Sequence, residues 1–320
     1  MNQHRLLVSL VLVGAATWPA ADRCIVAADF DVQQKPDRVL ITDSGRPVAT
    51  YVFSDDKILR PYFANVHAPG GIQVTRNHPP VPNVDATDHD TMHPGVWLAF
   101  GALSGQDFWR NKARIVHVRF VELPAVRAGQ ITFTAENSLQ AANGGEVCKQ
   151  TSRLTLAARP AGYLLIWEAT FRPEQRDMVF GDQEEMGLGI RVATPIAVKQ
   201  GGAIRDALGR RNEREVWGNS ADWCDYSGVI DGRHAGITTM CDPRNFRPSW
   251  LHARDYGALV VNPFGQQAFH KGPASKVVVK PGESFRLRYG VLLHAGPPDA
   301  VPDLKAAYAD FVAQLQRLGG

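Results

Sequence analysis

Two stretches of the chain concentrate side chains that transfer protons, bind metals or contact sugars. The first, residues 88–109, contains His89 and His93 among several Asp, Trp and Gly residues, and the second, residues 249–265, contains His252 beside aromatic and cationic residues. Polar, aromatic and Gly-rich segments bury little apolar surface for their length, so folding alone explains them poorly. We interpret the two stretches as parts of one site.

The two histidines of the first stretch have the spacing of a metal site but the wrong context for a helix. His89 and His93 are four residues apart, which on a helix places both on one face. Pro94 and Gly95 follow directly and favour a turn, and on a strand the two would be about 13 Å apart. We predict that His89 and His93 bind substrate or transfer protons; a purely structural role is the plainer alternative. A second alternative is that the loop binds a divalent metal ion through His89, His93 and Asp88.

Alternation in the second stretch predicts a face made for sugar chemistry. If residues 250–262 form one strand, one face carries Trp250, His252, Arg254, Tyr256 and Asn262. Histidine suits proton transfer, and an indole ring packs against the C–H face of a sugar. We therefore predict that His252 is catalytic and that the other four bind substrate. A solvated face with a few surface aromatics is the alternative.

Carboxyl partners come from a third region, residues 184–247. Aromatic residues beside carboxylates suit a carbohydrate cleft, because glycoside chemistry normally uses one carboxyl as acid and another as base or nucleophile. We predict Asp225 or Glu185 as the catalytic carboxyl group. The other side chains predicted to contact substrate are Arg247, Asn245, Trp223 and, from the first stretch, Trp97. These aromatic residues could equally have a structural role and fill the edge of the sandwich.

The elements that must position these residues are mostly strands. Apolar residues alternate along residues 163–171, 186–194 and 284–293, a pattern typical of half-buried antiparallel strands. The 29 Gly and 21 Pro residues interrupt such runs at short intervals. Only residues 302–318 show helical spacing. We predict an all-β fold, one large antiparallel β-sandwich with a C-terminal helix, as a single domain over residues 29–320.

The N-terminus predicts export. His4 and Arg5 precede LLVSLVLVGAATW, an apolar run of signal-peptide length followed by small residues. We expect a signal peptide over residues 1–28 and a periplasmic or secreted protein without a membrane span in the mature chain; an uncleaved anchor or a buried first helix is the alternative. Export permits a disulfide, and Cys224 with Cys241 is the pair we expect.

Charge and motifs exclude several classes of protein. The net charge of +3 is spread along the chain without a basic run, which argues against a nucleic-acid partner. The sequence has no GxSxG nucleophile elbow, P-loop, HExxH motif or GxGxxG motif opening a helix.

Several segments together resemble a known bacterial family. They are RPYFANVHAPGGIQVTRNHPP, DHDTMHPGVWLAFGALSGQDFW, WCDYSGVIDG and NFRPSWLHARDYGALVVNPFG. They are similar to uncharacterised secreted proteins labelled "methane oxygenase PmoA", across nearly the whole mature chain. Members of that family often read DHPHHRGLW where this chain has His89 to Trp97, so one His and the Arg are missing here. The resemblance implies a sandwich like that of the galactose-mutarotase superfamily, a fold that does not fix the reaction.

The sequence as a whole predicts an exported carbohydrate-active enzyme that uses general acid/base chemistry on a sugar or oligosaccharide. The reaction would be glycosidic bond cleavage, by hydrolysis or β-elimination, with epimerisation less favoured. It requires no cofactor. The alternatives are a non-catalytic carbohydrate-binding protein and a metal-dependent oxidoreductase, as the family label suggests.

Overall fold

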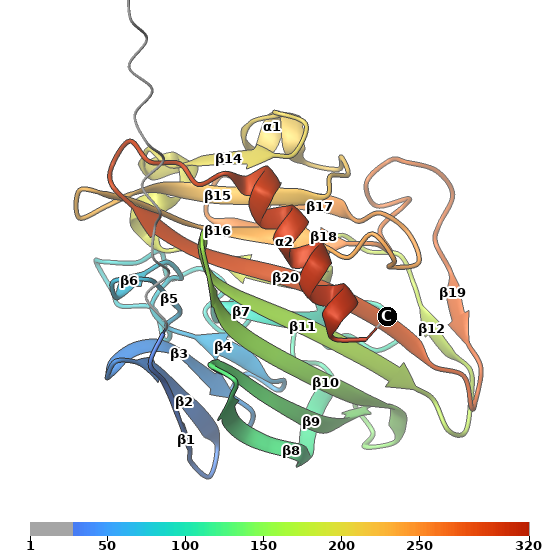
Figure 1. Cartoon of the computed structure of the whole chain (residues 1–320). Coiled ribbons are helices and arrows are strands. Elements are labelled where there is room, and N and C mark those ends of the chain that lie inside the picture. Colours follow the sequence, from blue (N-terminus) through green and yellow to red (C-terminus); the bar gives the residue numbers. More distant parts are fainter. Residues whose placement is uncertain (1–27, 320) are drawn as a thin grey trace, which may run out of the picture.

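Two large antiparallel sheets form the framework of the protein. The computed structural model describes residues 28–319, so nearly all of the predicted signal peptide lies outside the described residues. Sheet 1 has the strand order β1-β2-β3-β4-β7-β13-β18-β17, and sheet 2 has the order β14-β15-β16-β20-β11-β10-β9-β8 (Figure 1). The all-β antiparallel sandwich with a C-terminal helix is thereby confirmed.

The strands of sheet 1 are β1 (Phe30–Gln34), β2 (Arg38–Asp43), β3 (Arg46–Val52), β4 (Tyr62–Ala64), β7 (Val96–Phe100), β13 (Met186–Arg191), β17 (Trp250–Arg254) and β18 (Ala258–Asn262). Those of sheet 2 are β8 (Arg114–Arg127), β9 (Gln130–Gln140), β10 (Glu146–Arg159), β11 (Gly162–Arg172), β14 (Ala203–Asp206), β15 (Trp223–Ile230), β16 (Arg233–Cys241) and β20 (Phe285–Gly296). Short pairs are β5 (His67–Ala68) with β6 (Ile72–Gln73) and β12 (Met178–Phe180) with β19 (Val277–Val279). The helices are α1 (Asn212–Val216), α2 (Leu304–Arg317) and the 3-10 turns η1 (Thr194–Ile196) and η2 (Val198–Gln200).

The main core lies between the two sheets and follows the predicted alternation. On β11, Leu165, Trp167 and Phe171 belong to this core, and on β13 Leu188 and Ile190 do. Because successive side chains of a strand point to opposite faces, the other half of each strand is directed away from the core. Both sheets therefore have an outer face that needs a cover or a function.

Helix α2 covers the outer face of sheet 2. The ribbon of α2 crosses that face in Figure 1. Leu304, Phe311 and Leu315 are buried there together with Leu164 and Ile166 of β11. A Cβ at Gly290 would lie only 2.8 Å from the Phe311 ring, so glycine permits this close approach. The Asp303 side chain accepts a hydrogen bond from the Ala306 N–H at 3.0 Å and begins the helix.

Two local predictions were wrong. Residues 250–262 form a hairpin of β17 and β18 instead of one strand. The disulfide is absent too, since Cys224 and Cys241 are free, buried thiols in the described chain. Strand pairing places Cys224 opposite Thr239, so Cys241 is its diagonal neighbour, at a typical Cα separation of about 7–8 Å that is too long for a disulfide.

Within residues 28–319, none of the helices has both the length and the apolar character needed to cross a membrane.

We expect the packing of α2 to contribute strongly to stability. Phe311→Ala should lower the free energy of unfolding by about 3–5 kcal/mol, because it removes a fully buried ring and leaves a cavity against β20. Urea unfolding of the full chain measures this, with the exposed Gln316→Ala as the matched helical control. Equal stability of the two variants would contradict the account.

Candidate functional site

The outer face of sheet 1 gathers the predicted site residues. Strand pairing sets Trp97 of β7 opposite Gly189 of β13, Gly189 opposite Val260 of β18, and Val260 opposite His252 of β17. These four residues form one row across the sheet, which spans roughly 14 Å at the usual strand spacing. The first and second chemical stretches of the sequence therefore meet on one face, as expected.

The hairpin preserves the predicted face although it replaces the predicted strand. Trp250 pairs with Asn262, His252 with Val260, and Arg254 with Ala258. Directly opposite residues of an antiparallel pair point to the same side, so Trp250, His252, Arg254 and Asn262 share the outer face. Tyr256 lies in the turn between the strands.

Arg254 is the centre of an ionic network on this face. Its Nη2 lies 3.0 Å from Oε2 of Glu184, and its Nη1 lies 2.8 Å from Oε1 of Glu213. Glu213, at the start of α1, also accepts a hydrogen bond from the Asp255 N–H at 2.9 Å, and the Asp255 carboxylate accepts one from the Glu213 N–H. A strand, a helix and the segment before β13 are thus joined through one guanidinium.

His252 lies between Arg254 and Glu184. The Arg254 Nε donates to His252 Nε2 at 3.3 Å. A guanidinium can only donate, so Nε2 is unprotonated and the ring hydrogen of neutral His252 is on Nδ1. Nδ1 lies 3.1 Å from Oε2 of Glu184, a contact whose angle falls short of a good hydrogen bond. The imidazole is buried, with 5% of its surface exposed, and its two nitrogens face groups of opposite charge.

Both carboxyl groups of the network are held ionised. The neighbouring His252 and Arg254 lower the pKa of Glu184 below its ordinary value, against a smaller opposing effect of burial. Burial alone would raise the pKa of Glu213, but the Asp255 N–H and Arg254 outweigh it and the pKa is lowered. Apart from His252, the network therefore carries two carboxylates and one guanidinium at neutral pH.

A second group on the same face is a column of stacked rings. The Tyr256 ring lies 5.8 Å from His89, His89 lies 4.7 Å from His93, and His93 lies 5.0 Å from Trp97, measured between ring centroids. Interplanar angles of 7°, 10° and 15° make the column nearly parallel. Tyr256 follows Arg254 in the chain by two residues, so the column adjoins the ionic network.

His89 is oriented by an Asp that is itself held by a buried Arg. Nδ1 of His89 lies 2.7 Å from Oδ2 of Asp88, and Asp88 binds both terminal nitrogens of Arg191 at 2.9 and 2.8 Å. Among the described residues, Nε2 of His89 has no hydrogen-bond partner. An imidazole with Nδ1–H on a carboxylate and Nε2 free has the arrangement of a general base.

His93 is placed differently from His89. Its side chain is buried, and burial together with nearby His89 and Arg191 holds the pKa of His93 well below its ordinary value. The ring is therefore neutral at physiological pH. Its position beneath His89 and against Trp97 makes it a support for the column instead of a group that reaches substrate.

The alternative of a divalent metal on His89, His93 and Asp88 does not fit the geometry of these side chains. Zinc binds imidazole nitrogens in the plane of the ring at about 2.0–2.1 Å, whereas His89 and His93 are stacked with nearly parallel planes, so their lone pairs do not converge. Asp88 is committed to Arg191. Over residues 28–319, no three His, Cys, Asp or Glu side chains group into a metal-binding arrangement.

Other predicted contacts lie at the edge of the site or support it. Arg247 lies over the Trp250 ring at 5.9 Å, and both are partly exposed beside His252. Glu185 is close to the network but forms an ion pair with Arg110. Asn262 is fully buried and its amide donates to the carbonyls of Gln183, at 2.7 Å, and Glu184, at 3.0 Å. It therefore positions Glu184 and does not contact substrate.

Besides Asn262 and His93, four predicted site residues do not fit the structure. Trp97 is fully buried beneath His93 and cannot stack on a ligand. Asn245 uses both ends of its amide on the backbone of Arg288. Asp225 and Trp223 lie on β15 in sheet 2, on the outer face of the other sheet. Alternation predicts which face of a strand is buried, but not the sheet to which the strand belongs.

Sequence reasoning overlooked the buried arginines that hold the histidine loop. Arg76 donates to the carbonyls of Ala86 and Asp88, both at 2.7 Å, and Arg60 donates to the Trp109 carbonyl at 2.9 Å. Arg60, Arg76 and Arg191 are each 1–2% exposed. The burial of Arg191 could have been suspected, because it ends a strand of buried residues that contains two glycines. Arg60 and Arg76 lie in loops, where the sequence gives no comparable sign of burial.

Comparison with protein families identifies the chain. Residues 38–307 match the model of "Family of unknown function (DUF6807)", and the chain belongs to that family. A search of curated proteins gives no match.

Several solved structures have a backbone that partly superimposes on that of this chain. Heparan sulfate lyase HepC from Pedobacter heparinus is 9% identical with a TM-score of 0.39, over 85% of this chain and 36% of that chain. The GH36 alpha-galactosidase AgaB from Geobacillus stearothermophilus is 14% identical with a TM-score of 0.37, over 84% and 41%. A galactose mutarotase related enzyme from Lactobacillus acidophilus is 10% identical with a TM-score of 0.37, over 85% and 99%. This chain spans less than half the length of the lyase and of the galactosidase.

The Asp88–Arg191 pair should make stability depend on pH. Burial would raise the pKa of Asp88, but hydrogen bonds from Arg191 and His89 hold it well below its usual range. Because the folded-state pKa is depressed, the stabilisation is present above the unfolded-state value of about 3.9 and is lost as the pH falls below it.

Asp88→Asn should therefore have a free energy of unfolding about 1–2 kcal/mol lower than that of the native protein at pH 7. The expected loss is moderate because Asp88 is partly exposed, and solvent weakens its ion pair with Arg191. The difference should shrink between pH 5 and pH 3. Urea unfolding of both proteins across this range tests it, and a difference that stays constant down to pH 3 would show that Asp88 is not the group involved.

Proposed function

We propose that this protein is an exported carbohydrate-active enzyme whose site is the outer face of sheet 1. The observation that carries the proposal is the placement of His252 between Arg254 and Glu184, with aromatic rings at its side. A buried imidazole in contact with an ionised carboxylate and a cation is poised for proton transfer. Structural networks also produce such contacts, so the aromatic surroundings matter to the argument.

The aromatic rings supply surfaces for the C–H faces of sugars. Trp250 and Trp217 are both partly exposed, and the Arg254 guanidinium lies 5.8 Å from the Trp217 ring. Phe269 lies between them, 6.4 Å from Trp250 and 5.4 Å from Trp217. Half-exposed indoles with polar groups beside them are suited to a ligand that is apolar on one face and rich in hydroxyls at its edges.

The charges of the site favour a neutral sugar. The one guanidinium nearest His252 is already bound by Glu184 and Glu213, which leaves an excess negative charge. A substrate carboxylate placed there would meet two ionised carboxyl groups. Among the reactions considered, this favours hydrolysis or epimerisation of a neutral sugar over β-elimination, which needs a uronate neutralised by a cation at the proton-transfer groups; Arg247, which has no carboxylate partner among the described residues, lies at the edge beside Trp250.

We assign the two proton-transfer roles to His252 and His89. His89 Nε2 accepts a proton from a substrate hydroxyl or a water molecule, and the resulting imidazolium is stabilised through Nδ1–H by Asp88. His252 with Glu184 serves the opposite side of the substrate, where Arg254 must turn away from Nε2 before that nitrogen takes part. Arg247 and Tyr256 bind hydroxyls at the edges.

His252→Ala and His89→Ala should each lower kcat by about 10²–10⁴-fold if these side chains transfer protons. The purified protein is screened against neutral and acidic polysaccharides and oligosaccharides, with detection of reducing ends and of unsaturated products. His117→Gln, on β8 of sheet 2, is the matched control. Unchanged turnover in both alanine variants, with folding intact, would refute the assignment, and ligand binding without product in the native protein would identify a carbohydrate-binding protein.

The charge argument has its own test. Glu213→Gln removes one of the two carboxylates on Arg254, so the preference for neutral over uronate-containing ligands should fall, by about tenfold for one unit of charge at this site. The ratio of affinities for a matched neutral and uronic oligosaccharide measures this, with Glu215→Gln, an exposed carboxylate of the same helix, as control. A native protein that prefers the uronic ligand would contradict the charge argument.

A further inference from the structure

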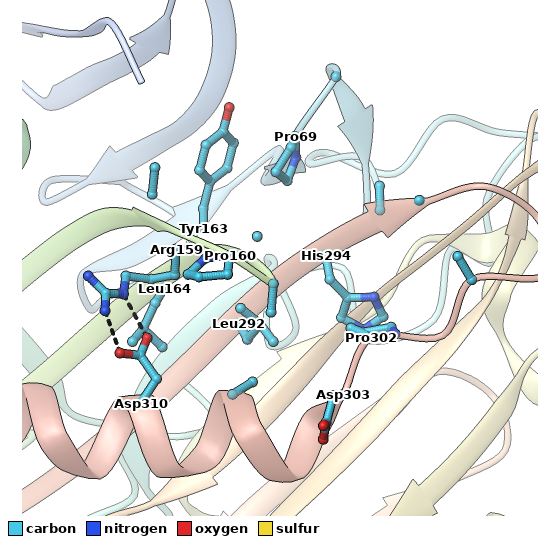
Figure 2. A pocket seen from close by; sticks show the side chains of 18 of the residues that line it. Pro69, Arg159, Pro160, Tyr163, Leu164, Leu292, His294, Pro302, Asp303 and Asp310 are labelled. Carbon is cyan, nitrogen blue, oxygen red and sulfur yellow. Dashed lines mark hydrogen bonds and ion pairs between the residues drawn. The ribbon is translucent and has the colours of Figure 1, made fainter. Parts of the chain in front are cut away.

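A cavity of about 770 Å³ lies beside sheet 2, away from the His252 site. Its walls come from the turn between β10 and β11, the end of β20, the first turns of α2 and the turns at Ser44 and Gly70 (Figure 2). The volume is within the range of small-molecule binding pockets, about 300–1,000 Å³. Nothing in the chemistry assigned to sheet 1 uses this cavity.

Most of the lining is apolar, and the side chains of Tyr163, Arg159, Asp43 and Asp310 are already paired within the protein. Leu164, Leu292 and a series of Ala, Pro and Gly residues form the walls. Tyr163 donates its hydroxyl to Asp43, and Arg159 donates to Asp310 at 2.6 Å (Figure 2). Asp303 accepts the Ala306 N–H. A ligand would thus be held mainly by apolar contact.

The charges around the cavity are predominantly negative. Among the described residues, Asp43, Asp303 and Asp310 line it, against one lining cation, Arg159. Arg233, whose guanidinium lies next to Gly70, and Arg46, which acts electrostatically on Tyr163, oppose these charges from outside the lining. The carboxylate oxygens keep lone pairs free beyond the bonds above, so they can accept hydrogen bonds from a cationic group. An anion would be repelled.

The lining also includes His294, 1% exposed, which is fixed by a buried carboxylate. Its Nε2 lies 2.8 Å from Oδ1 of Asp225, and Asp225 also accepts from Ser227 at 2.6 Å and Thr238 at 2.7 Å. Within the described chain, Nδ1 of His294 has no hydrogen-bond partner. A buried, unpartnered polar atom in a wall is the kind of group that a ligand or water satisfies. Asp225, predicted as a catalytic carboxyl, thus belongs to this second region.

We propose that this cavity is a binding site for a small organic cation with an apolar body, of the alkylamine class. The apolar walls take the body of the ligand, and the Asp303 carboxylate, which has no ion-pair partner among the described residues, takes its charged end. The proposal is independent of the carbohydrate site, because no residue is shared between the two.

Calorimetric titration of the full chain with octylamine and octanoate tests both parts of the proposal, since the two probes have the same chain length and opposite charge at pH 7. We expect one saturable octylamine site and binding of octanoate at least about tenfold weaker. Ala306→Trp should abolish octylamine binding by filling the cavity from an exposed position on α2. Ala309→Trp, also exposed on α2 but outside the lining, should leave it unchanged.

Ala300→Trp, in the loop before α2, is a second filling variant if Ala306→Trp unfolds early in a thermal melt. Three results would overturn the proposal: no saturable octylamine binding to the native protein, equal binding of octanoate, or full binding by a folded cavity-filling variant.

Discussion

The arrangement of the candidate site depends on one guanidinium with two carboxylates. Arg254 on β17 binds Glu184, which precedes β13, and Glu213, which begins α1, and it also contacts His252. Three segments distant in sequence are therefore fixed on the same outer face. A guanidinium can serve this purpose because its planar set of donors reaches several acceptors at fixed angles, which a lysine could not reproduce. Loss of this residue would leave two carboxylates close together without a counter-ion.

The two outer faces of the sandwich are used differently. On sheet 2, α2 buries the apolar residues of β11 and β20, and what remains open is the cavity beside its first turns. On sheet 1, a loop carrying His89 and His93 folds over Trp97, and the hairpin β17–β18 stays partly exposed. The partly exposed side chains of this hairpin include the aromatic rings of Trp250 and Tyr256 beside Arg254, which solvation alone does not require. That contrast supports the placement of chemistry on sheet 1.

The sequence was sufficient for the strands, the C-terminal helix and much of one site face. Alternation correctly predicted the inward residues of β11 and β20, because one buried face imposes a period of two. It also grouped His252, Arg254 and Asn262 on one face, although it missed the turn at Tyr256. The grouping survives because even-numbered residues of β17 lie opposite even-numbered residues of β18, and opposite residues point to the same side of the sheet.

The rest could not be predicted because it depends on tertiary arrangement. Which sheet receives β15 decides that Asp225 meets His294 and not His252, and no local pattern encodes that choice. The burial of Trp97 depends on a loop held by Arg60 and Arg76 through backbone carbonyls. Backbone acceptors have no sequence signature, so such contacts become visible only in the folded chain.

The central claim is that His252 and His89 act at one carbohydrate site, and imidazole ¹⁵N NMR tests it most directly. In the free protein, His252 should be the tautomer with its hydrogen on Nδ1, because Arg254 donates to Nε2. Saturation with the glycan that the protein turns over should shift the ring nitrogens of both His252 and His89 and leave those of His294 unchanged. A hydrogen on Nε2 of His252, or ligand shifts confined to His294, would contradict the account.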